Sequence, residues 1–219
     1  MLTIASQFLF FLEIILFVTV MLMHLVKKNA TLIFLYAIQS LIIAATLFHS
    51  AIKEASLLLI AVVVLTFLIK VIVAPYFFWG LIKKRRQQFS ASTYLNAPLT
   101  LITLALLTTL SYSNFFKPLI ALAPNHGNTV LLSVGMMLVS IFLIINRKGI
   151  LSQMVGLLSL ENAIVSFAYV TGLETAAGPQ LGILFDILIW VIIATVFASM
   201  IYQHFGSLDT SVMQNLKEE

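Results

Sequence analysis

Four ionisable side chains lie inside long apolar stretches of the sequence: Glu13, Lys70, Glu161 and Asp186. Gln39 adds a further polar residue in such a stretch. A charged group at the centre of a bilayer costs about 2.5–3.5 kcal/mol on insertion scales, so each charge is expected to face the protein interior or a partner subunit. Because burial favours the neutral form of a carboxyl group, an unpaired acid at this depth could bind and release a proton.

Most of these polar groups are expected to share one central layer of the membrane. A helical rise of about 1.5 Å per residue places all of them except Asp186 roughly 13 to 20 Å from the inner ends of their helices. Glu13 and Lys70 fall in one three-helix unit, which predicts an ion pair between them, although Lys70 could instead bridge to another subunit. Glu161 and Asp186 have no cation in their own unit and are predicted to be steps of a proton path. The competing interpretation is that all the charges form neutralised structural pairs.

The composition predicts an all-α integral membrane protein. Apolar residues make up 61% and charged residues only 9% of the 219 residues, and the mean hydropathy is +1.10. A spanning helix needs about 20 predominantly apolar residues. The apolar runs are continuous and lack the alternation of barrel strands. They predict about seven transmembrane helices, at 4–26, 31–51, 56–82, 98–123, 128–146, 150–172 and 180–204.

The basic residues predict how the chain is oriented. Lys27 and Lys28, the run 83–86, and Arg147 with Lys148 all follow alternate spans. The positive-inside rule therefore puts the N-terminus outside and the C-terminal tail in the cytoplasm. A basic run beside a span end is an orientation signal, so no nucleic-acid partner is expected.

The two ends of the chain resemble each other in pattern. Each has a helix, a short basic turn, a helix with a central polar group and a helix with a central charge. This predicts two three-helix parallel repeats joined by a central helix. The predicted units are an N-terminal three-helix unit at 1–90, a connecting helix at 91–126, a second three-helix unit at 127–205 and a cytoplasmic tail at 206–219.

Neither a metal site nor a catalytic motif is predicted in this chain. The sequence has no cysteine, which excludes protein thiolate ligands for iron–sulfur clusters or nickel. His24 and His204 lie near helix ends, and a haem held by both is a weak alternative. Pro75, five residues after Lys70, predicts a kink beside a buried charge.

The C-terminal part of the chain resembles a known family of membrane subunits. The resemblance lies in NRKGILSQMVGLLSLENAI, then LFDILIW, then the tail LDTSVMQNL. These segments look like the K-type (4L) subunit of respiratory complex I and the C subunit of multisubunit sodium/proton antiporters. The resemblance matches Glu161 to the first membrane acid of that family and Asp186 to the second, where complex I commonly has glutamate.

The whole chain, with YAIQSL and KVIVAP in its N-terminal unit, resembles component E of hydrogenase-4. This resemblance implies a non-catalytic subunit of a group 4 nickel–iron hydrogenase or formate hydrogenlyase-like complex in a prokaryotic cytoplasmic membrane. It implies antiporter-like membrane partners and a peripheral arm that carries the metal centres and iron–sulfur clusters. The alternatives are a stand-alone secondary transporter for a small solute and a purely structural membrane scaffold.

Overall fold

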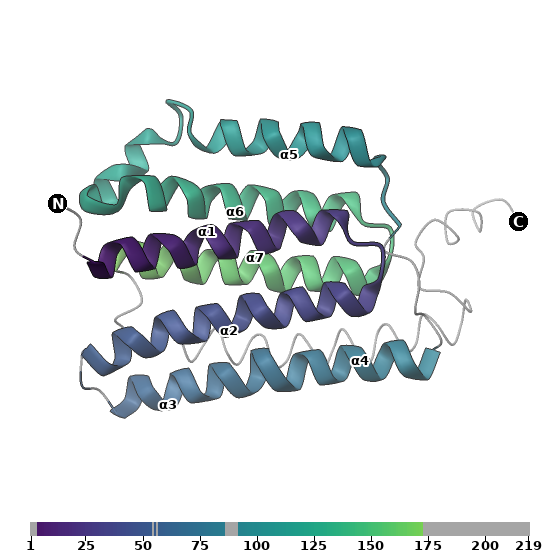
Figure 1. Cartoon of the computed structure of the whole chain (residues 1–219), viewed down its shortest axis with the longest axis horizontal. Coiled ribbons are helices and arrows are strands. Elements are labelled where there is room, and N and C mark those ends of the chain that lie inside the picture. Colours follow the sequence, from purple (N-terminus) through teal and green to yellow (C-terminus); the bar gives the residue numbers. More distant parts are fainter. Residues whose placement is uncertain (1–3, 54, 56, 86–91, 173–219) are drawn as a thin grey trace, which may run out of the picture.

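The computed structural model describes residues 4–53, 55, 57–85 and 92–172, which form a bundle of helices along one axis (Figure 1). The predicted span 180–204, with Asp186, and the tail 206–219 lie outside the described residues. The longer helices are α1 (Ile4–Leu25), α2 (Asn29–Lys53), α3 (Leu57–Thr66), α4 (Ala74–Arg85), α5 (Ala97–Ser111), α6 (Gly127–Asn146) and α7 (Ile150–Thr171). A π-helix, η1 (Phe67–Val73), joins α3 to α4, and two short 3₁₀ helices, η2 (Lys117–Leu122) and η3 (Pro124–His126), precede α6.

The described part confirms an all-helical chain suited to a membrane. It contains four helical stretches that are long and apolar enough to cross a bilayer: Asn29–Ile52, Leu59–Lys83, Pro124–Asn146 and Ile150–Thr171. The apolar stretch of α1, Phe10–Leu25, is shorter. The count of seven spans and the internal repeat stay predictions.

The predicted span 98–123 is not one continuous helix, so this prediction is wrong in its length. The side chain of Asn96 caps the first turn of α5, and the helix ends at Ser111 after 15 residues. That length corresponds to about 22 Å, which is less than a hydrocarbon core of roughly 30 Å. Ser113 and Asn114 favour turns over helix, and Pro118 lacks the N–H that would continue a helical ladder.

Four helices form the centre of the bundle, and the others lie at its edges. α6 and α7 make a tight antiparallel hairpin, α1 packs along α6, and α2 packs along α7. α5 lies at one edge against α6, and α3, η1 and α4 lie at the opposite edge against α2 (Figure 1). Helices α2 and α7 therefore bring residues from the two predicted units into direct contact.

The hairpin of α6 and α7 depends on small residues. A Cβ atom at Gly156 would lie 3.0 Å from the side chain of Ile144 and 3.2 Å from its backbone nitrogen. The hydroxyl groups of Ser140 and Ser159 lie 3.2 Å apart across the same interface. Small side chains let two membrane helices approach closely, and interhelical hydrogen bonds add to the packing.

A larger residue at Gly156 should force these two helices apart. We expect Gly156→Leu to lower the thermal midpoint in detergent, because overpacking a close contact costs about 1–3 kcal/mol. Gly80→Leu is the matched control, since a Cβ at Gly80 meets nothing within 4 Å. Equal midpoints for the two variants would contradict the close packing of α6 on α7.

The turn between α6 and α7 holds the end of α1. Arg147 is only 1% exposed, and its Nη2 donates to the backbone carbonyls of Met23 and of Val26, the latter at 2.9 Å. Carbonyls at a helix C-terminus lack partners within the helix, and a cation is favourable there. Lys27 and Lys28 are exposed, whereas Arg147, which belongs to the same predicted orientation signal, is buried.

Loss of this arginine should destabilise the bundle. We expect Arg147→Gln to lower the free energy of unfolding by about 1–3 kcal/mol, because the carbonyls at the end of α1 lose a charged donor in a buried place. Lys28→Gln removes the same charge from an exposed site and serves as the control. The measurement is unfolding in mixed micelles, and similar losses for the two variants would argue against the cap.

Candidate functional site: a buried ion pair between apolar clusters

Two clusters of buried apolar side chains fill the bundle, and polar residues lie between them. The basic-end cluster, nearer the turns 26–28 and 147–149, includes Tyr36, Phe78 and Leu158. The far-end cluster includes Ile43 and Ala163. Along α2 and α7 the buried residues between these clusters are polar. We call the residues that one network of contacts joins at this level the polar layer, and it consists of Gln39, Ser40, Lys70, Glu161 and Asn162.

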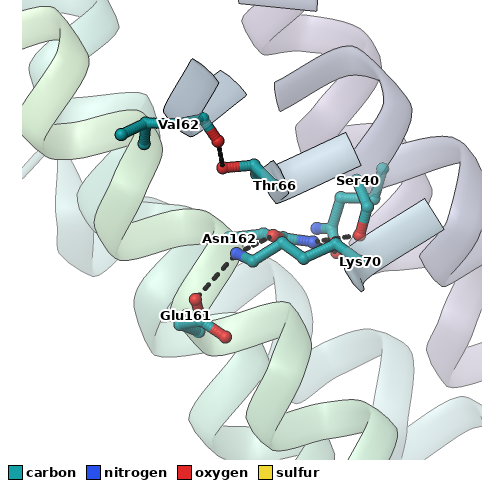
Figure 2. A network of polar contacts seen from close by, with 7 residues as sticks. Ser40, Val62, Thr66, Lys70, Glu161 and Asn162 are labelled. Carbon is teal, nitrogen blue, oxygen red and sulfur yellow. Dashed lines mark hydrogen bonds and ion pairs between the residues drawn. The ribbon is translucent and has the colours of Figure 1, made fainter. Parts of the chain in front are cut away.

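An ion pair between Lys70 and Glu161 is the centre of the polar layer. The Nζ of Lys70 lies 2.7 Å from Oε1 of Glu161, and the side chains are 1% and 20% exposed. Figure 2 shows Lys70 reaching from its helix to α7. The predicted pair between Lys70 and Glu13 is therefore wrong. Glu161 has no cation in its own predicted unit but pairs with Lys70 of the other unit.

Asn162 connects the ion pair to α2. Its Oδ1 accepts a hydrogen bond from Nζ of Lys70 at 2.9 Å. Its Nδ2 donates to Oε1 of Gln39 at 3.2 Å and to Oγ of Ser40 at 3.1 Å. The polar layer thus joins three helical segments, η1, α7 and α2, through one amide (Figure 2).

The backbone around Lys70 is a π-helix of seven residues. The N–H of Ala74 donates to the carbonyl of Ile69, five residues earlier, and Pro75 cannot extend this ladder because it has no N–H. The sequence predicted a simple proline kink here, whereas the structure has a wider helical turn. Short π segments inside α-helices are frequent at functional sites.

The π segment explains the burial pattern along the continuous helical stretch of α3, η1 and α4. Buried residues recur every four positions, whereas in a straight α-helix each residue turns by about 100°, so such a stripe drifts by about 40° at every step. The wider turn takes up part of this drift and keeps the stripe against α2. The stripe consists of Val62, Thr66, Lys70, Ala74, Phe78 and Ile82. In the sequence only Thr66 and Lys70 of this stripe differ from their apolar neighbours, so the spacing could not be recognised there.

Glu13 forms a separate polar contact, further towards the far end. Both of its carboxyl oxygens lie 2.6 Å from Oγ of Ser166 on α7, and the residue is 3% exposed. Among the described residues no basic side chain pairs with it. Glu13 of α1 therefore contacts α7 one helical turn beyond the polar layer, so α7 takes part in both sets of contacts.

The structure brings together four of the five residues predicted for the relay. Glu161, Lys70 and Gln39 belong to one hydrogen-bonded layer, and Glu13 of α1 contacts Ser166 of α7 beside it. Asp186 lies outside the described residues. Three residues that complete these contacts had no predicted role: Asn162, Ser40 and Ser166. Their polar side chains within apolar runs were the available signal.

The histidines do not form a metal site in the described part of the chain. No group of three His, Cys, Asp or Glu side chains there could hold an ion. The Nε2 of His24 lies 3.0 Å from the carbonyl oxygen of Val139, and its ring stacks on Phe142. This histidine is used in packing α1 against α6, while His204 lies outside the described residues.

Protonation of Glu161 would weaken this ion pair. Buried charges are costly unless they are paired and hydrogen-bonded, and Lys70 meets both conditions only while Glu161 is ionised. A proton that reaches the partly exposed carboxylate would cancel its charge and weaken its hold on the ammonium group. The site can thus couple protonation of Glu161 to the position of Lys70.

A double-mutant cycle tests which acid is coupled to the lysine. We expect Lys70→Met and Glu161→Gln to show a coupling energy of about 0.5–3 kcal/mol in unfolding, because each single change leaves a charge without its partner. Lys70→Met and Glu13→Gln should be additive within about 0.3–0.5 kcal/mol. Coupling to Glu13 in place of Glu161 would contradict the observed pair.

Comparison of the chain with protein-family models, curated proteins and solved structures found no match. The resemblance to complex I-type and hydrogenase-4 membrane subunits therefore stays a prediction from the sequence.

Proposed function

We propose that this chain is a non-catalytic membrane subunit of a complex I-related oxidoreductase, of the group 4 nickel–iron hydrogenase or formate hydrogenlyase type. In this role it contributes to proton or sodium translocation through its buried carboxyl groups. The proposal is supported by the sequence resemblance and by one observation above all, the buried Lys70–Glu161 pair within a hydrogen-bonded layer.

The physical argument starts from the cost of the charges. A passive bundle could fill this position with apolar residues, and replacing a buried ion pair in that way is often neutral or stabilising. Ionisable residues inside membrane helices are rare and mark ion or proton pathways. The acid is 20% exposed while its lysine is 1% exposed, so the acid can meet a partner subunit at the surface of the bundle while the cation stays inside.

The proposed placement follows the positive-inside rule. The chain lies in a prokaryotic cytoplasmic membrane, with its N-terminus outside and its C-terminus in the cytoplasm. It contributes no cofactor, and the hydrogenase-type arm with its metal centres and iron–sulfur clusters belongs to partner subunits. The antiporter-like partners lie beside it in the membrane.

The test is ion pumping by the complete complex. We expect the compensated variant Lys70→Met with Glu161→Gln to assemble, because it removes both charges together, and to lose most ion uptake into inverted membrane vesicles. Ser159→Ala, a buried hydroxyl on α7 outside the polar layer, is the matched control and should pump normally. Assembly is checked by co-purification and mass spectrometry of the partner subunits.

The other outcomes separate the alternatives. Normal pumping by the correctly assembled double variant would show that the pair is structural and that the chain is a scaffold. Transport by the purified chain alone in liposomes, with no partners co-purifying from the native membrane, would favour a stand-alone secondary transporter.

A further inference from the structure

The orientation of two side-chain amides in the polar layer is fixed by Lys70. An ammonium group can only donate hydrogen bonds, so the atom of Asn162 that it contacts must be the carbonyl oxygen. The amide nitrogen of Asn162 must then donate to Gln39, which accepts with its own oxygen. The Nε2 group of Gln39 is therefore a donor that needs an acceptor elsewhere.

That donor has no acceptor among the described residues, although Gln39 is only 1% exposed. The hydroxyl group of Tyr36 is in the same situation, with a side chain that is 0% exposed. Tyr36 and Gln39 are three residues apart and share one face of α2. The Tyr36 hydroxyl also lies near the hydroxyl of Ser40, without full hydrogen-bond geometry, and within electrostatic range of Glu161.

Two unsatisfied groups at this depth need a physical explanation. Each unpaired polar group in a nonpolar interior costs several kcal/mol, and apolar clusters close the polar layer on both sides. Buried water molecules characteristically bind about three such groups. A cation is a poor occupant, because Nε2 of Gln39 and Nζ of Lys70 offer only donors.

We propose that the polar layer holds buried water bound by Tyr36, Gln39 and Glu161, and that Glu161 exchanges its proton with this water. The second part rests on the proposed function. Glu161 gives its proton to the water oxygen and takes one back from the hydronium ion that forms. Tyr36 and Gln39 hold the water in place and carry no proton.

X-ray footprinting with hydroxyl radicals tests the water site on the purified full chain. Radicals made from bound water oxidise adjacent aromatic rings, so Tyr36 should be modified at doses that leave Phe78 unmodified. Phe78 is 1% exposed and belongs to the same basic-end cluster, which makes it the matched control. Equal protection of Tyr36 and Phe78 would overturn the proposal.

A second measurement uses Tyr36→Phe, which keeps the ring and removes the hydroxyl group. Removal of a hydroxyl that binds water should lower the thermal midpoint, whereas removal of an unsatisfied hydroxyl should leave it unchanged or raise it. Tyr76→Phe, at a side chain that is 76% exposed, is the control and should have no effect. A midpoint for Tyr36→Phe at or above that of the wild type would count against the water site.

The proton exchange with this water is tested in the assembled complex. Tyr36→Phe removes a group that holds the water and should slow ion pumping several-fold with assembly intact. Unchanged pumping would overturn the proton exchange while the footprint still decides the water site. If the wild-type complex itself pumps no ions, the proposed function fails, and the footprinting result stands independently of it.

Discussion

The Lys70–Glu161 pair is the interaction on which the rest of this structure depends. A lysine that is 1% exposed can stay charged only if an anion and hydrogen-bond acceptors are within reach, because the interior offers little other screening. Three features meet this requirement. The π segment holds the lysine against α2, Asn162 accepts its second hydrogen bond, and apolar clusters on both sides limit competing water. Breaking such a pair on one side alone typically costs about 3–5 kcal/mol.

The sequence predicted the helices far better than it predicted the contacts between them. Hydropathy finds membrane helices because each needs about 20 apolar residues, and the spans at α2, α6 and α7 follow that rule. Depth was also predictable from the helical rise, which placed Glu13, Glu161 and Lys70 in similar layers. Depth does not say which way a side chain points, so it could not choose between the two acids. The choice depends on the π segment, which changes the direction of the side chains in and after it. Pro75 predicted only a kink at this place.

Arg147 shows a second limit of the same kind. In the sequence it is part of a basic turn, and such turns are exposed in most membrane proteins. In the structure α1 ends directly beside this turn, and its unpaired carbonyls attract the guanidinium into the interior. Neighbouring Lys148 instead lies over the ring of Tyr94, at 5.1 Å from its centroid. Which of two adjacent cations is buried is decided by a helix more than a hundred residues earlier, and no local pattern contains that information.

Four contacts of buried polar or charged groups cross between the first and the last part of the described chain. Lys70 meets Glu161, Gln39 meets Asn162, Glu13 meets Ser166, and the end of α1 meets Arg147. Taken apart, the first part would leave Lys70 without its anion, and the last part would leave Arg147 without its carbonyl acceptors. The two parts are therefore complementary in their buried polar groups. If the chain were cut between α5 and η2, we expect the two fragments to associate, because each supplies the partners of buried groups in the other.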